Sequence, residues 1–244
     1  LAYDQYYNDF VGFMFDENGN YLADIGSPTS SQLSDEEYHK AVNDAEELFG
    51  IDLNDDGIKG RNVTKLDELL EIRNVGFNTL NDTTNLTDLY ADVNSGDLFF
   101  AAAGDTNYVE LLDYDGYNFG INVLDGYKPL AIEEITDSSQ GIEYVGNHVL
   151  LAYDEYMYQL VGFMFDQYGS YIADLGSPED QTSINQAEEL FGIDINGDNH
   201  QGRNVQAFDT AAYVASKNLT TFTGATNTKS LFVDQNSGEL LFAD

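Results

Sequence analysis

The chain has 244 residues, 42% of them hydrophobic and 13% aromatic, which is enough for packed cores and a suitable length for two domains of ordinary size. Its 44 acidic and nine basic side chains give a net charge of −35, which argues against nucleic acid and anionic membrane surfaces as partners and favours cations. No apolar run approaches the ~18 residues of a membrane span, and the absence of cysteine excludes disulfides and thiolate zinc sites.

The sequence contains the same pattern twice. LAYDQYYNDFVGFMFDENGNYLADIGSP at 1–28 returns as LAYDEYMYQLVGFMFDQYGSYIADLGSP at 151–178, and AEELFGIDLNDDGIKGRNV at 45–63 returns as AEELFGIDINGDNHQGRNV at 187–205. The offset falls from 150 to 142 residues between these blocks, so the second copy is eight residues shorter in one loop. Because internal repetition indicates the architecture, we expect two homologous tandem domains, residues 1–104 and 105–244.

Two kinds of hairpin recur along the chain. In each copy an apolar run VGFMF is followed by a glycine-containing turn and a second short apolar run, which predicts a β-hairpin near residues 11–23 and again near 161–173. The tripeptide Asn-Ser-Gly separates two further apolar runs at 94–96 and again at 236–238. The sequence therefore predicts two antiparallel hairpins in each copy.

Helices are expected between these hairpins. Ser34 followed by Glu37 matches a capping box, and the apolar residues that follow have helical spacing up to Gly50, a suitable residue just past a helix end. The matching helix of the second copy is shorter, over about 183–191. A weaker second helix is predicted over 65–72 and over 206–215.

Residues 104–149 join the two copies and have no counterpart before Leu1. The stretches 109–124 and 127–136 alternate apolar and polar residues as strands do. The first copy therefore lacks the opening strands of the second. We expect that the chain was excised from a longer tandem array, or that another molecule supplies those strands. The predicted class is α+β and mainly β.

An acidic loop follows the first helix of each copy. In the first copy, Asp52, Asn54 and Asp56 occupy alternate positions and are followed by Gly57. This D-x-N-x-D-G spacing is the first half of an EF-hand-type loop, in which alternating oxygen side chains converge on Ca²⁺. The residue after the third ligand must turn sharply, often with positive φ, which glycine permits. A solvated Asx turn is the alternative interpretation.

The second copy repeats the loop with a few changes. Asp194, Asn196 and Asp198 replace the three ligands, and Asn199, which tolerates positive φ, replaces the glycine. The next position normally supplies a backbone carbonyl, and here it is Ile58 in the first copy and His200 in the second. We expect the His200 ring to lie exposed beside the loop. Calcium fits this ligand set better than magnesium, which prefers fewer protein ligands.

The ligand that would close each loop is not set by the spacing. Position twelve, where an EF-hand has Glu and a dockerin-like loop has Asp, is Val63 or Val205. The candidate closing ligands are the acidic residues four positions later in each copy, and the alternatives are acidic residues of the preceding helix. The candidates are Asp67 and Asp209, and the alternatives are Glu46, Glu47, Glu188 and Glu189.

The run F-G-I-D-[LI]-N-x-D-x-x-x-G after an acidic helix, with F-D-x-x-G-x-Y before it, resembles the tryptophan-rich C-terminal domain repeated in large secreted proteins of cyanobacteria and marine bacteria, often beside RTX-type calcium repeats. Residues 124–244 follow the family's order of elements, and residues 1–102 cover all but the opening strands. The chain has no Trp and carries Tyr127, Tyr153 and Phe165 where family tryptophans would fall. The resemblance implies a secreted or cell-surface bacterial calcium-binding module.

No catalytic constellation stands out. The three histidines lie apart from any nucleophile elbow, no pair of carboxylates is singled out for glycoside hydrolysis, and there is no phosphate-binding glycine loop. We therefore expect a non-enzymatic structural or adhesive module that binds calcium and self-associates head to tail, with neighbouring repeats or into a fibre by strand addition. The alternative is a carbohydrate-binding module that uses exposed tyrosines, because one buried face cannot hold all of Tyr3, Tyr6, Tyr7, Tyr153, Tyr156 and Tyr158. A buried barrel or sandwich core is the other interpretation of these rings.

Overall fold

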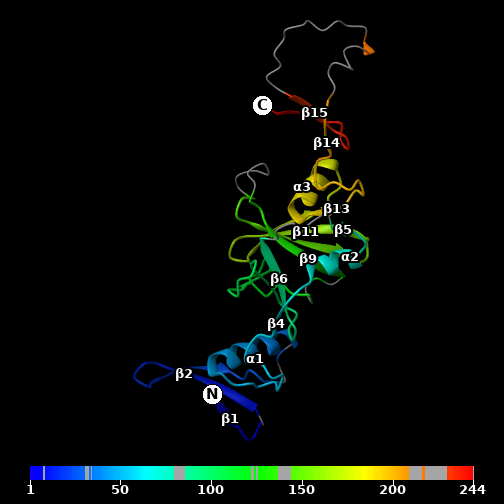
Figure 1. Cartoon of the computed structure of the whole chain (residues 1–244). Coiled ribbons are helices and arrows are strands. Elements are labelled where there is room, and N and C mark those ends of the chain that lie inside the picture. The colour runs from blue at the N-terminus through cyan, green and yellow to red at the C-terminus, as the bar shows by residue number, and fades with distance from the viewer. Residues whose placement is uncertain are drawn as a thin grey trace.

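The computed structural model describes residues 1–7, 9–30, 33, 35–79, 86–121, 124, 126–136, 144–208, 216–217 and 230–243. Over these residues the chain forms antiparallel sheets and three longer helices. The predicted α+β, mainly β class is therefore confirmed. Figure 1 shows an elongated molecule, with one small sheet at each end and the main body between them.

The two end sheets have three strands each, and both contain predicted hairpins. The N-terminal sheet consists of β1 (Ala2–Asp4), β2 (Asp9–Phe15) and β3 (Tyr21–Gly26). The C-terminal sheet consists of β14 (Val205–Ala207), β15 (Ser230–Asp234) and β16 (Leu240–Ala243). The structure thus confirms the hairpin at 11–23 and the hairpin turned by Asn-Ser-Gly at 236–238.

The main body contains two four-stranded sheets and one two-stranded ladder. One sheet has the order β12-β11-β10-β9, with bounds Tyr171–Gly176, Gln159–Phe165, His148–Asp154 and Tyr127–Glu134. The other has the order β4-β6-β7-β8, with bounds Val63–Lys65, Thr87–Asp92, Leu98–Ala102 and Val109–Glu110. The ladder pairs β5 (Asn78–Thr79) with β13 (Ile193–Asp194).

The main core lies between these two sheets and crosses the predicted boundary at residues 104 and 105. Leu89 and Phe100 of β6 and β7 pack in one buried cluster with Ile132, Leu150 and Phe165 of β9, β10 and β11. The second half of the first copy thus packs against the first half of the second copy. The packing that stabilises the body therefore depends on residues from both copies.

The opposite face of the β9–β12 sheet is covered by helices. Ile72 of α2 (Glu68–Asn74) and Phe191 of α3 (Gln181–Phe191) are buried in a cluster with Val149, Leu151 and Met164 of the sheet. Adjacent strand residues such as Leu150 and Leu151 lie in different clusters, because successive side chains of a strand point to opposite faces. Together these elements form three layers, sheet on sheet on helices.

Helix ends follow the local capping signals. The helix α1 (Asp35–Phe49) ends at Gly50, whose φ is 64° and whose N–H donates to the Glu46 carbonyl at 2.7 Å, as predicted. α3 begins with a capping box between Asp180 and Ser183, two residues before the predicted start. Ser34, which was predicted to cap α1, lies outside the described residues.

The prediction of a second helix was partly wrong. Residues 63–65 are a strand paired with β6, and α2 begins three residues after the predicted start because Asp67 caps it through the Leu70 N–H. In the second copy, residues 205–207 form β14, and residues 209–215 lie outside the described residues. Among the described residues of 109–124, the strand prediction holds for β8 alone, because residues 113–116 turn on Gly116, where φ is 82°.

Candidate functional site

The two acidic loops occupy equivalent junctions of the fold. The first, residues 50–62, leads from α1 to β4, and the second, residues 192–204, leads from α3 through β13 to β14. Each loop therefore connects a helix and sheet on one side with the next three-stranded or four-stranded sheet along the chain (Figure 1).

Hydrogen bonds from the loop backbone fix the predicted side-chain ligands of the first loop. The Gly57 N–H donates to Asp52 Oδ2 at 2.9 Å, and the Asp56 N–H donates to Asn54 Oδ1 at 3.0 Å. The Ile58 N–H donates to Asp56 Oδ1 at 2.8 Å. These Asx-type bonds hold all three side chains against the loop that carries them.

The second loop repeats this pattern at equivalent positions. The Asn199 N–H donates to Asp194 Oδ2 at 3.0 Å, the Asp198 N–H to Asn196 Oδ1 at 2.9 Å, and the His200 N–H to Asp198 Oδ1 at 2.7 Å. The His200 ring is exposed beside the loop, as expected, with Nδ1 3.1 Å from the Asp198 carbonyl oxygen. The oxygen side chains of the two loops therefore have the same arrangement.

The sharp turn predicted after the third side chain is confirmed in both loops. Gly57 has φ of 86° and Asn199 has φ of 64°, in the left-handed region that glycine and asparagine accept most readily. The turn brings the chain back toward the start of the loop, and this is the curvature that a cation-binding loop of this type requires.

A buried glutamate of the preceding helix lies under each loop. Glu46 and Glu188 are fully buried. Glu46 accepts hydrogen bonds from the N–H groups of Leu53, Asn54 and Gly60 at 2.6, 3.1 and 2.9 Å. This carboxylate therefore joins the beginning of the first loop to its end.

Glu188 makes only part of the equivalent set of contacts. Its Oε1 accepts from the Ile195 and Asn196 N–H groups at 2.8 and 3.1 Å, but its buried Oε2 has no hydrogen-bond partner. Burial, with a further contribution from the charges of Asp198 and Asp194, raises the pKa of Glu188 above its usual value. A buried carboxylate oxygen without a partner is costly, and a cation would compensate it.

An asparagine from a distant hairpin turn completes each loop. Asn94 Nδ2 donates to Asp56 Oδ2 at 2.6 Å, and Asn236 Nδ2 makes the equivalent bond to Asp198 Oδ2. The bond from Asn94 is the main reason that the pKa of Asp56 lies below its usual value. For Asp198, burial acts to raise the pKa. Hydrogen bonds, of which that from Asn236 is the largest, outweigh burial, so the pKa of Asp198 also lies below its usual value.

The same hairpins are also tied to the helices. Asn43 of α1 donates to Asp92 of β6 at 2.9 Å, and Asn185 of α3 donates to Asp234 of β15 at 3.2 Å. Helix, acidic loop and hairpin turn are thus connected by side-chain hydrogen bonds in both copies. Sequence reasoning missed these partners, although the Asn-Ser-Gly turns were noted as repeated features.

Of the two predicted closing ligands, the structure describes Asp67. The Asp67 carboxylate accepts the Leu70 N–H at 3.1 Å as the N-cap of α2, and Asp209 lies outside the described residues. Glu47 and Glu189, two of the alternatives, pack over Gly60 and Gly202, where a Cβ would collide with their side chains. The other two alternatives, Glu46 and Glu188, are the ones whose carboxylates accept backbone N–H groups of the loops.

The residues of the loops fit a hard, oxygen-binding cation in kind. Within the described ranges, no group of three or more His, Cys, Asp or Glu side chains is arranged so that it could hold a metal ion. An ion at these loops would therefore depend on Asn and backbone oxygens as well as on carboxylates, which is the mixed ligand set that calcium accepts. The orphaned Glu188 Oε2 is the observation that favours such a ligand.

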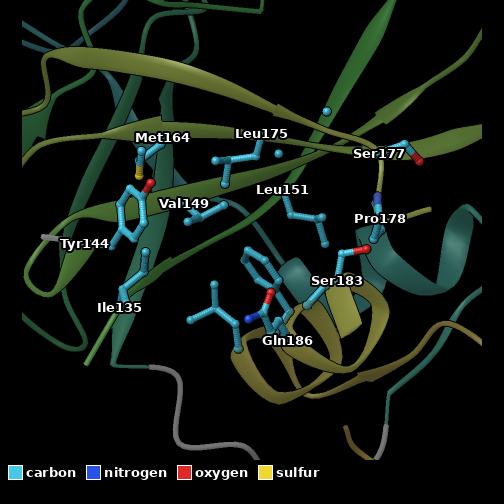
Figure 2. Close-up of a pocket in the computed structure, with 15 residues that line it drawn as sticks. Ile135, Tyr144, Val149, Leu151, Met164, Leu175, Ser177, Pro178, Ser183 and Gln186 are labelled. Carbon is cyan, nitrogen blue, oxygen red and sulfur yellow. The ribbon is translucent and has the colours of Figure 1, made fainter. Parts of the chain in front are cut away.

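A separate hollow of about 300 Å³ lies between α3 and the β9–β12 sheet. Figure 2 shows Val149, Leu151 and Leu175 on the sheet side and Ser183 and Gln186 on the helix side. The lining is predominantly apolar, without the converging polar groups that orient a small polar ligand. A hollow with equivalent lining residues lies beside α1 in the first copy.

Tyrosines gather at the turns that follow the LAYD segments. Tyr6 and Tyr7 in the first copy, and Tyr156 and Tyr158 in the second, are all highly exposed. The prediction of exposed tyrosine rings is thus confirmed for these four residues and for Tyr3, which is 50% exposed. Tyr153 instead packs against the helical side of the core. Each turn is held by an aspartate that accepts backbone N–H groups, such as Asp154 from Tyr156 at 2.8 Å.

The sequence matches no family model, no curated protein and no solved structure. Along the described part of the chain, no helix is both long and apolar enough to cross a membrane.

Proposed function

We propose that the protein is a non-enzymatic, extracellular calcium-binding module with a structural or adhesive role at the bacterial cell surface. The observation that carries the proposal is the buried Oε2 of Glu188, which lacks a partner and lies against a loop that presents Asp194 and Asp198. Three acidic groups at one loop repel one another, and a divalent cation relieves that repulsion.

The side chains that would hold the ion are the same in kind in both copies. The first loop would use the side chains of Asp52, Asn54 and Asp56, the Ile58 carbonyl and Glu46, and the second the side chains of Asp194, Asn196 and Asp198, the His200 carbonyl and Glu188. A bound calcium ion would supply the positive charge that balances these carboxylates. Asp67 and Asp209 stay candidates for the closing position.

The position of the loops supports a structural role. Each loop lies between one sheet and the next, and the third of its predicted side-chain ligands, Asp56 or Asp198, is hydrogen-bonded to the hairpin turn of that next sheet. Residues that order the loop therefore also fix the orientation of the helix before it and the hairpin after it. We infer that the loops stiffen the elongated chain at two joints.

Other features support the proposed setting. The acidic composition and the absence of cysteine suit a secreted protein that relies on cations instead of disulfides, and the resemblance to secreted bacterial repeats points the same way. Self-association by strand addition is part of the proposal. Among the described strands, β1 pairs only with β2, whereas β10 is paired on both sides.

The experiment is thermal unfolding of the whole chain in chelator, in calcium and in magnesium at equal ionic strength. Calcium is expected to raise the melting temperature more than magnesium does, because a ligand that binds only the folded state stabilises it in step with its affinity. Equal melting temperatures in calcium and in chelator would contradict the calcium proposal.

A second candidate function is carbohydrate binding, favoured by the exposed rings of Tyr6, Tyr7, Tyr156 and Tyr158. Exposed tyrosines offer flat apolar faces with a polar tip, which suits sugar rings. Binding on a glycan array that is lost on Tyr156→Ala would favour this function. Unchanged binding in that variant would argue against a role of this turn.

A further inference from the structure

The main core combines two different halves of the repeat. β6 and β7 come from the first copy, β10 and β11 come from the second, and their facing side chains include Leu98 and Phe165. Figure 1 shows the two remaining halves, the β1–β3 sheet and the β14–β16 sheet, at opposite ends of the molecule. The N-terminal end thus carries the first sheet of the repeat, and the C-terminal end carries the second sheet of the repeat.

The N-terminal sheet has the same backbone pairing as the β10–β12 sheet. Gly12 pairs with Gly26 and Phe15 with Tyr21, and the equivalent residues Gly162, Gly176, Phe165 and Tyr171 pair in the same way, with register shifts at the same places. The surroundings differ. Phe165 is 0% exposed under the β6–β7 hairpin, whereas Phe15 is 56% exposed.

The C-terminal sheet has the same pairing as the β4-β6-β7 part of the other central sheet. Val205 pairs with Asp234 as Val63 pairs with Asp92, and Val233 pairs with Leu240 as Ala91 pairs with Leu98. Leu98 is 0% exposed in the main core, whereas Leu240 is 52% exposed. Both end sheets therefore expose side chains whose counterparts are buried against each other inside the chain.

We propose that the β14–β16 face of one copy docks on the β2–β3 face of a second copy, in the way that the β6–β7 hairpin packs on β10 and β11 within the chain. Leu240 and Leu231 would cover Phe13 and Phe15 of the second copy. The internal core is the template for this interface, because equivalent residues meet there in the same polypeptide. The inference rests on the proposed structural role, for which it names the surface and the partner.

The geometry of the interface determines the kind of assembly. The two faces are different and lie at opposite ends, so each copy uses one face to bind the next and leaves its other face free. A heterologous contact of this kind gives open chains and not a closed dimer. Burying these large apolar side chains stabilises the contact, and the cost of association is subtracted from that gain.

Two features weaken the contact relative to the internal core. The chain has one set of the residues Leu111, Phe119 and Leu124, which fill the internal core between the sheets, and that set is already used there. The net charge of −35 per copy also opposes association, and salt screens this repulsion. We therefore expect reversible, concentration-dependent chains that lengthen as ionic strength rises.

The experiment is sedimentation velocity of the full chain from about 1 µM to about 1 mM, the range over which weak to moderate interfaces dissociate. The weight-average mass of the wild type is expected to rise with concentration and to pass the mass of a dimer. Phe15→Gln and Leu240→Gln are each expected to remain monomeric. Because each variant keeps one intact face, their equimolar mixture is expected to form dimers and nothing larger.

Leu22→Gln is the matched control. Leu22 is 56% exposed, and its counterpart Ile172 is still 44% exposed in the complete core, so the proposed partner does not cover this position. This variant is expected to associate as the wild type does. If circular dichroism shows that Phe15→Gln does not fold, Phe13→Gln on the same face takes its place.

The proposal is overturned if the folded wild type stays monomeric, if either single variant associates as the wild type does, or if their mixture forms no dimer. Parallel runs in calcium and in chelator separate it from the calcium proposal. Association without any calcium-dependent rise in melting temperature leaves the interface standing and removes the calcium site. If calcium raises the melting temperature but the variants associate as the wild type does, the calcium site stands and the interface is ruled out.

Discussion

The side-chain amide of Asn94 donates a 2.6 Å hydrogen bond to the carboxylate of Asp56, a residue 38 positions earlier in the chain. The bond connects the acidic loop after α1 to the turn of the β6–β7 hairpin, where the Val93 N–H also donates to the Asn62 carbonyl at 2.9 Å. The second copy makes the same connection between Asn236 and Asp198 at the same separation of 38 positions. The loop and the hairpin turn therefore behave as one unit in each copy.

Asn94→Ala is expected to lower the free energy of unfolding by about 0.5–1.5 kcal/mol, the net contribution of a typical hydrogen bond. It should also reduce the stabilisation that calcium produces, because Asp56 loses the partner that orients it. Chemical denaturation with and without calcium measures both effects. The control is Asn107→Ala, which removes a similar bond to Asp105 outside both acidic loops. Equal calcium effects in the two variants would contradict the role given to Asn94.

The first acidic side chain of each loop provides a test of the two sites separately. Asp52→Ala and Asp194→Ala are each expected to remove part of the calcium-induced rise in melting temperature, and the double variant is expected to remove all of it. At free calcium about 100 times the dissociation constant, one site contributes about 2.7 kcal/mol, which differential scanning fluorimetry detects. Asp113→Ala, which breaks an Asx turn outside the loops, is the control and should keep the full rise.

A substitution of Glu188 tests whether this residue is a calcium ligand or has a structural role alone. Glu188→Gln keeps an oxygen that accepts the Ile195 and Asn196 N–H groups but removes the buried charge that lacks a second partner. In chelator, the variant is expected to be at least as stable as the wild type, since an uncompensated buried charge has been removed. In calcium, it is expected to be less stabilised than the wild type. A variant that is destabilised in chelator and equally stabilised by calcium would rule out Glu188 as a ligand.

A buried glutamate in the main body is expected to make the free energy of unfolding depend on pH, independently of calcium. Burial, with smaller contributions from the charges of Glu68 and Asp88, raises the pKa of Glu133 to about 8. The unfolded chain releases this proton near the ordinary value of 4.5, so between these values the folded state binds more protons and stability falls as pH rises. Glu133→Gln is expected to remove this part of the loss. Urea unfolding at pH 5 and pH 9 should show a variant that gains stability over the wild type only at the higher pH, and an equal loss in both proteins would contradict the assignment.

Local sequence signals predicted the local structure well. The hairpins, the turn at Gly50 and the positive φ of Gly57 and Asn199 were all predictable, because each depends on a few neighbouring residues. The residues of the acidic loops were predictable for the same reason, since alternate oxygen side chains and one permissive turn residue define the pattern. Where the signal was weak, as at 205–207, pairing with a distant strand gave β14 where a helix was predicted.

Long-range packing was not predictable from the same signals. The sequence shows two copies, but it does not show that the second half of one packs against the first half of the other, because that choice depends on which sheet faces meet. The contact between Asn94 and Asp56 also needed the structure. Its one sequence signal is the equal spacing of 38 positions in both copies, which persists although nearby residues differ. The N-cap role of Asp67 also needed the structure, and its role as a closing ligand stays a prediction.

Isothermal titration calorimetry of the chelator-treated full chain with calcium counts the calcium sites. We expect two calcium ions bound per wild-type chain, one in Asp52→Ala and one in Asp194→Ala, with much weaker binding of magnesium. If the wild type takes up no calcium at low millimolar concentrations, or if the double variant binds calcium as well as the wild type does, the acidic loops are not calcium sites.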